Sequence, residues 1–148
     1  MEDVYEVKTD CNGTKKYYKN DLLHREDGPA IEWANGTIEW FIKGKRHRID
    51  GPACEYSDGT KCWYINGLFH REDGPAIEAP NGTKKWLING QYHRDDGPAI
   101  EWYDGDIWWY INQVSITEEV EEWRFDNNIS RYEDWTSKEI ALFKLKFL

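Results

Sequence analysis

Short runs of alternating apolar and polar residues fill most of this chain, and glycine-containing turns separate them. Asn-Gly-Thr or Asp-Gly-Thr begins at Asn12, Asn35, Asp58 and Asn81, and Asp-Gly-Asp begins at Asp104, so the spacing is 23 residues each time. Such dipeptides between alternating apolar residues are the strongest short-range signal for a β-hairpin. The sequence therefore predicts hairpin units over 12–34, 35–57, 58–80 and 81–103, with a partial unit over 104–113.

Most units carry a second turn signal eight residues later, at Lys43–Gly44, Asn66–Gly67 and Asn89–Gly90. If both turns contain two residues, Ile31 faces Trp40 and Trp63 faces His70. Isoleucine, tryptophan and histidine then share an apolar face, and the glutamates lie on the opposite, solvated face. That second face also takes one aromatic or leucine per unit. A three-residue loop would reverse this placement, because side chains alternate along a strand.

The pattern changes after residue 113. Ser115 stands three residues before Glu118, and Thr136 stands three residues before Glu139, which is the spacing of a helix capping box. Val120 and Trp123, and later Ile140, Phe143 and Phe147, recur at helical spacing. We expect one or two short helices over 114–148 that cap the open end of the repeat, although a partner-docking element is the alternative.

The predicted fold is mainly β: antiparallel hairpin units of 23 residues that form an elongated twisted sheet or open solenoid, with short C-terminal capping helices. Residues 1–113 form the repeat domain and residues 114–148 the cap. At 148 residues, with 16% aromatic side chains, the chain has room for one domain with a real core.

One nonapeptide is written four times, at residues 24–32, 47–55, 70–78 and 93–101, and it holds all four histidines of the chain. Its shared pattern is His-Arg-x-Asp-Gly-Pro-Ala. The candidate site residues are the row His24, Arg25, Asp27, His47, Arg48, Asp50, His70, Arg71, Asp73, His93, Arg94 and Asp96.

Two interpretations of this row stay open. In the first it is structural: aspartate shapes a turn, arginine pairs with acids, and histidine stacks on tryptophan, as repeat stacking requires. In the second the row binds a ligand. A guanidinium can form paired hydrogen bonds with a phosphate or a carboxylate, and four weak contacts together give a higher affinity than one. Phe41, Tyr64 and Tyr110, taken as exposed aromatics, would complete such a contact surface.

Enzymatic and metal-dependent functions are not indicated. A catalytic site needs one set of residues in different roles, whereas these candidates occur in four equivalent copies. One histidine per unit places neighbouring imidazoles too far apart for a single ion. The sequence contains no phosphate-binding loop, dinucleotide fingerprint or zinc-protease motif. We therefore predict no catalytic residue, no metal and no cofactor.

Charge and cysteine content limit the kinds of partner and the cellular compartment that the sequence predicts. The net charge is −9, but residues 12–103 are nearly balanced, with 13 basic and 14 acidic side chains. Without a basic stripe, direct nucleic-acid binding is not expected. Three cysteines without metal-ligand spacing, an acidic N-terminal stretch and no long apolar run favour a cytoplasmic protein that does not enter membranes.

The stretch "NGTKKWLINGQYHRDDGPAIEWYDG" resembles the MORN-variant-like short repeats of uncharacterised bacteriophage and giant-virus proteins. The resemblance covers residues 12–113. It implies stacked hairpins in an elongated sheet and a role as a scaffold, adaptor or dimerisation surface. The His-Arg-x-Asp-Gly-Pro stretch departs from typical MORN units, and no face is basic, so lipid binding is not carried over.

These observations together predict a non-enzymatic protein-binding module. With the viral resemblance, the expected partner is a host protein in the host cytoplasm, which the chain inhibits or adapts; a homo-oligomer is also compatible. One alternative is a sponge that sequesters a small phosphorylated or nucleotide-like anionic ligand through the arginines. The other is an acidic nucleic-acid mimic.

Overall fold

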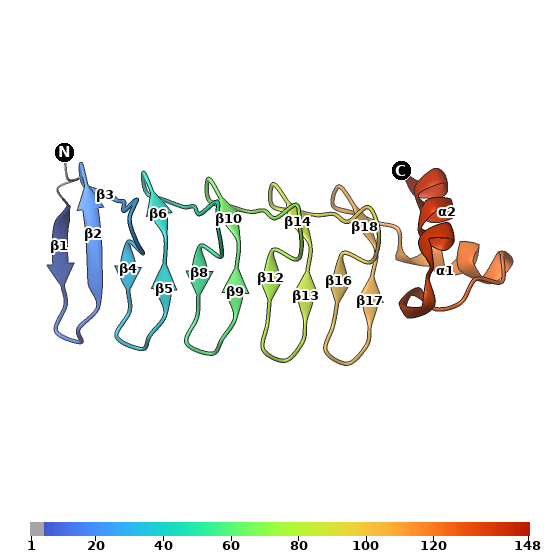
Figure 1. Cartoon of the computed structure of the whole chain (residues 1–148), viewed down its shortest axis with the longest axis horizontal. Helices are drawn as coiled ribbons and strands as arrows, with labels where there is room; N and C mark the ends of the chain where they lie inside the picture. Colours follow the sequence, from blue (N-terminus) through green and yellow to red (C-terminus); the bar gives the residue numbers. More distant parts are fainter. Residues whose placement is uncertain (1–4) are drawn as a thin grey trace.

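An open row of antiparallel hairpins makes up most of the computed structural model, and two helices close its C-terminal end (Figure 1). The structure describes residues 5–148. Residues 1–4, which belong to the predicted repeat domain and to its acidic N-terminal stretch, lie outside the described residues. The predicted mainly β hairpin repeat with C-terminal helices is confirmed, and the sheet is not closed into a barrel.

One main sheet runs the length of the repeat. Within residues 5–148 it contains 11 strands in the order β1-β2-β4-β5-β8-β9-β12-β13-β16-β17, with β3 paired to β2. Its strands are β1 (Glu6–Thr9), β2 (Lys15–Lys19), β3 (Leu22–Leu23), β4 (Ile31–Glu32), β5 (Ile38–Glu39), β8 (Cys54–Glu55), β9 (Lys61–Cys62), β12 (Ile77–Glu78), β13 (Lys84–Lys85), β16 (Ile100–Glu101) and β17 (Ile107–Trp108). Each of the units 35–57, 58–80 and 81–103 therefore adds two strands to the sheet.

A second, smaller hairpin follows from the upper end of this sheet in each unit after the first (Figure 1). These hairpins are β6 (Phe41–Ile42) with β7 (Lys45–Arg46), β10 (Tyr64–Ile65) with β11 (Leu68–Phe69), β14 (Leu87–Ile88) with β15 (Gln91–Tyr92), and β18 (Tyr110–Ile111) with β19 (Val114–Ser115). Ile65 pairs with Leu68, and the His70 amide donates to the Trp63 carbonyl at 3.1 Å, as the two-residue turn predicts. Asn66 and Gly67 both have positive φ, which this turn requires.

The first turn of each unit is one residue longer than expected. Ile31 pairs with Glu39 and not with Trp40, and Trp33 donates to the Thr37 carbonyl across three loop residues. Gly36 alone in this loop has positive φ, as in a type I turn followed by a left-handed glycine. The predicted register was therefore wrong by one residue, and the tryptophans share a face with the glutamates instead of the isoleucines.

Buried residues gather between units and under the cap. Ala53, Cys54, Cys62 and Tyr64 form one repeat cluster. Burial raises the pKa of the Cys54 thiol to about 12 and that of Cys62 to about 11, so both thiols stay protonated in the core. Between residues 5 and 148, the structure has no helix with the length and apolarity that crossing a bilayer would require.

The cap consists of α1 (Thr117–Asp126), a 3-10 turn (Tyr132–Asp134) and α2 (Ser137–Phe147). The Thr136–Glu139 capping box is present, as predicted. The Ser115–Glu118 capping box was wrong, because Ile116 is the N-cap residue of α1 and makes no side-chain cap. Strand structure also continues through β19, to Ser115. Val120 and Phe143 are fully buried against Trp109, so the helices cover the last repeat unit.

Candidate functional site

Each His-Arg-x-Asp-Gly-Pro segment leads from a small hairpin into the next strand of the main sheet. Its arginine lies over an aromatic ring of the same unit. The distance from the guanidinium Cζ to the ring centroid is 4.0 Å for Arg25 and Tyr17, 4.1 Å for Arg48 and Trp40, 4.1 Å for Arg71 and Trp63, and 3.9 Å for Arg94 and Trp86. Because the three-residue turn places tryptophan on the glutamate face, this stacking follows from the register.

The four guanidinium groups are engaged by their own units. Arg71 Nε donates to Asp73 at 2.8 Å, and Arg71 Nη1 donates to the Pro75 carbonyl at 3.2 Å and to Glu78 at 2.7 Å. The same three acceptors serve Arg25, Arg48 and Arg94. Two carboxylates thus surround each arginine, and its charge is compensated before any ligand arrives.

The glycine of each His-Arg-x-Asp-Gly-Pro segment packs against the arginine of the same segment, which the sequence did not show. A Cβ atom on Gly74 would lie 2.9 Å from Cζ of Arg71, and Gly28, Gly51 and Gly97 meet their own arginines at 2.8 to 3.0 Å. These four glycines do not have the positive φ of turn glycines. A larger residue at this position would displace the guanidinium, which lies directly on the backbone.

The histidines connect consecutive units. His47 Nδ1 accepts the amide proton of Asn66 at 3.1 Å, and His24, His70 and His93 accept from Lys43, Asn89 and Asn112 in the same way. A neutral imidazole that accepts at Nδ1 carries its proton on Nε2. In three units that atom lies near the x residue: Glu26 at 3.2 Å, Glu72 at 3.6 Å and Asp95 at 2.7 Å.

Three equivalent hollows lie between successive segments. The first hollow is lined by Trp40, Ile42 and the segments that begin at His24 and His47, and its volume is about 560 Å3. The second hollow contains Trp63 and Ile65 at about 640 Å3, and the third contains Trp86 and Ile88 at about 690 Å3. Each is bordered by two arginines and at least three carboxylates, and the third is also bordered by Lys144 of α2.

Exposed acids separate the hollows. We call Glu26–Asp27, Ile49–Asp50, Glu72–Asp73 and Asp95–Asp96 the acidic ridges. The side chains of Asp50, Glu72 and Asp73 are each 84% exposed. Asp50 borders the first and second hollows, and Asp73 borders the second and third. The surface therefore alternates tryptophan-lined hollows with carboxylate ridges.

The structure brings the predicted histidine, arginine and aspartate residues together. The predicted aromatics are their backbone neighbours, because the amides of Arg25, Arg48 and Arg94 donate to the carbonyls of Phe41, Tyr64 and Tyr110, but the aromatic side chains do not line the hollows. Phe41 and Tyr64 are buried, with 9% and 8% of their surface exposed, and Tyr110 is half-buried against Tyr92. Taking them as an exposed contact surface was therefore wrong, because the shifted register turns them into the core. The residues that line the hollows, tryptophan and isoleucine two positions apart in each unit, were missed, although that spacing places both on one side of a strand.

The arginine contacts lower the pKa of the ridge aspartates. The side-chain hydrogen bonds from Arg48 and Arg71, and then their charges, hold the pKa of Asp50 and of Asp73 below the ordinary value of 3.8. In the variant Arg71→Gln, we expect the pKa of Asp73 to rise toward that value while Asp50 keeps its low pKa. Side-chain carboxyl NMR during an acid titration measures both in one sample, and an unchanged Asp73 would contradict the assignment.

The lowered pKa of Asp73 also affects how the free energy of unfolding changes with acid. A carboxyl whose native pKa is depressed contributes stability above its unfolded-state pKa and loses it as the pH falls through the native pKa. Arg71→Gln should therefore lose less stability on acidification below about pH 4 than the unmodified chain does.

The described residues hold no group of three or more His, Cys, Asp or Glu side chains placed to bind a metal ion. No protein-family model matches the chain, and none of the curated proteins is significantly similar to it in sequence. The MORN-like resemblance therefore stays a prediction, and the geometry of the hollows and ridges carries the functional argument.

Proposed function

We propose that this chain is a non-enzymatic protein-binding module that holds a basic segment of a partner along its acidic ridges and hollows. The observation that supports this proposal most directly is the threefold repetition of one tryptophan-lined hollow between exposed carboxylates. Three equivalent weak contacts on one rigid row gain affinity by multivalency. The viral setting and a host target remain part of the proposal through the resemblance alone.

The geometry favours a basic partner over the anionic sponge. An anionic ligand would have to compete with the aspartate and the glutamate that each arginine already contacts, and it would approach several exposed carboxylates. A basic segment would instead meet those carboxylates directly, which speeds association and sets the binding register. Proteins that bind nucleic acids also present basic surfaces. A chain that mimics a nucleic acid with its acidic ridges would therefore be one form of this proposal.

A displayed library of random peptides, selected on the immobilised full chain, tests this proposal. We expect enrichment of peptides with net positive charge, and weaker binding as salt rises. The double variant Glu72→Lys/Asp95→Lys should lower their affinity about tenfold, because it reverses two ridge charges.

The matched control is Glu122→Lys/Asp126→Lys, which makes the same charge change at two exposed positions of α1. This control should keep the affinity of the unmodified chain. Enrichment of neutral or acidic peptides, or an equal loss in the ridge variant and the control, would overturn the proposed function.

A further inference from the structure

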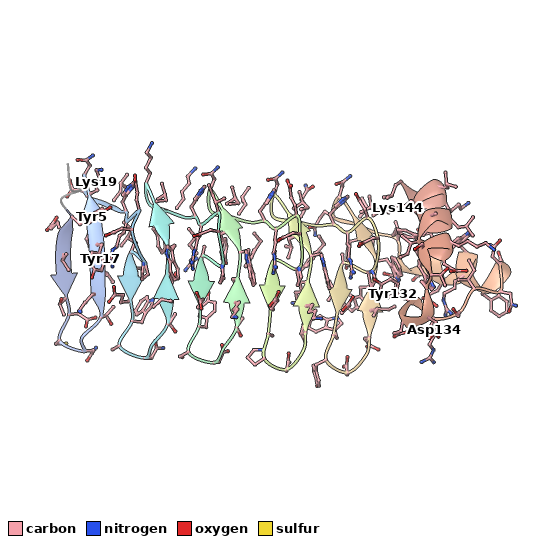
Figure 2. The ribbon with its side chains drawn as sticks, viewed as in Figure 1. Tyr5, Tyr17, Lys19, Tyr132, Asp134 and Lys144 are labelled. Carbon is pink, nitrogen blue, oxygen red and sulfur yellow. The ribbon has the colours of Figure 1, made fainter. Side chains whose placement is uncertain are left out.

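The cap fills the place where a fourth hollow would lie. The first three hollows are bordered by arginines of successive units, and the fourth would lie beyond Arg94, over Trp109. There the repeat ends, because Thr117 stands where the next arginine would be. Tyr132 of the cap points toward the last unit at this position (Figure 2).

Tyr132 contacts the same kinds of residue that line the open hollows. Its hydroxyl accepts a hydrogen bond from Arg94 Nη2 at 3.0 Å, and its ring meets the Trp109 ring edge-on at a centroid distance of 5.4 Å. The hydroxyl oxygen also lies so close to Gly97 that a Cβ atom there would clash with it. A phenol therefore fits between the arginine, the glycine and the tryptophan of this repeat.

The three open hollows offer the corresponding contacts without such an occupant. Among residues 5–148, Nη2 of Arg25, Arg48 and Arg71 donates no hydrogen bond, whereas Nε and Nη1 of each are engaged. Trp109 is only 1% exposed under the cap, but Trp40, Trp63 and Trp86 remain partly exposed. Each open hollow thus presents a spare donor beside an indole that is partly exposed, although the arginine of its own unit lies over the ring.

We propose that the three open hollows take tyrosine side chains of a partner, with Tyr132 as their internal counterpart. This inference rests on the proposed function and specifies the partner. Two strands per unit at about 4.8 Å each place the hollows about 9.6 Å apart. A polyproline II segment repeats every three residues, at about 9.3 Å, and presents every third side chain on one side. The matching ligand has tyrosine at every third position and basic residues between.

The test uses the full chain and the nonapeptide Tyr-Pro-Lys written three times. We expect it to bind more tightly, by about tenfold or more, than peptides in which phenylalanine or alanine replaces every tyrosine, because phenylalanine cannot accept from Nη2. A peptide of equal composition with its three tyrosines adjacent controls for spacing and should also bind about tenfold more weakly. Fluorescence anisotropy measures all four affinities.

Filling the hollows gives a second readout. Ile65→Trp/Ile88→Trp places bulk in the second and third hollows and should remove the preference for tyrosine over alanine. Lys61→Trp/Lys84→Trp adds the same side chains at exposed strand positions of the same two units and should preserve it. A circular dichroism melt of each variant confirms that it is folded.

The outcomes separate this inference from the proposed function. If the tyrosine and alanine peptides bind equally and Glu72→Lys/Asp95→Lys weakens both, the tyrosine inference is overturned while the basic-segment proposal stands. If no lysine-containing peptide binds at all, the inference is overturned directly. A tyrosine preference that is unchanged in Ile65→Trp/Ile88→Trp would place the phenol elsewhere and would also overturn it.

Discussion

Replacing Trp109 with alanine should lower the free energy of unfolding by about 3–5 kcal/mol, the usual cost of removing a buried aromatic side chain. Trp109 is 1% exposed and joins the repeat to the cap. Its ring centroid lies 4.8 Å from that of Phe143 and 5.2 Å from that of Trp135. Without it, both helices lose the surface on which they pack.

Urea denaturation of the unmodified chain and the variant measures this loss. Limited proteolysis should also show earlier cleavage between residues 117 and 148, because the cap would open more often than the repeat. Trp108→Ala is the matched control: its side chain is 44% exposed, so its cost should stay below about 1 kcal/mol. A similar small cost for Trp109→Ala would mean that the cap does not depend on this contact.

The repeat and its hairpins could be predicted because the signals are local. A period of 23 residues, the turn dipeptides and the Thr136–Glu139 capping box need no knowledge of distant contacts, and the structure confirms them. The second turn was also assigned correctly, since Asn66 and Gly67 adopt the paired positive φ values typical of a two-residue hairpin loop.

The first turn could not be assigned from its dipeptide alone, because the same letters Asn-Gly support two loop lengths. Asn35 Oδ1 accepts the Thr37 amide at 3.0 Å, and Thr37 Oγ1 accepts the amide of Ser57, in the loop of the next main-sheet hairpin, at 3.0 Å. These contacts favour the three-residue loop, and the second of them spans 20 residues. The register of the main sheet, and with it the composition of the hollows, therefore depends on interactions between successive hairpins.

The role of the arginine row was undecided from sequence for a related reason. Whether a guanidinium binds a ligand or its own unit depends on where the acids lie. Glu78 is seven residues from Arg71 in sequence, yet its Oε1 atom is 2.7 Å from Nη1. The hydrogen bonds of Nε and Nη1 stay within each unit, which supports the interpretation that the arginine row stabilises the repeat. Nη2 of Arg25, Arg48 and Arg71 remains available to a ligand.

The second large effect concerns the ion pair between Glu39, which is buried in the main sheet, and Arg46 of β7, which is 39% exposed. Glu39 is 4% exposed, and its carboxylate accepts from Arg46 Nε at 2.7 Å and from Trp33 Nε1 at 2.7 Å. Burial lowers the pKa of Arg46, but the hydrogen bond and charge of Glu39 outweigh it and raise that pKa above its ordinary value.

We expect Arg46→Ala to cost about 3–5 kcal/mol at neutral pH, because it leaves a buried carboxylate without its cation. Lys45→Ala, at the neighbouring exposed position, is the control and should change stability by less than about 0.5 kcal/mol.

The repeat itself supplies the variant that should rescue this loss. At the positions of Glu39 and Arg46, the next unit has Cys62 and Phe69, which belong to its apolar cluster. The double variant Glu39→Cys/Arg46→Phe removes both charges together, and buried ion pairs exchanged for apolar residues often keep or gain stability. We therefore expect its free energy of unfolding to lie within about 1 kcal/mol of the unmodified chain, well above that of Arg46→Ala, when both are measured by urea denaturation. If the double variant were as unstable as Arg46→Ala, the lost packing of the arginine stem, and not the uncompensated charge of Glu39, would account for the cost.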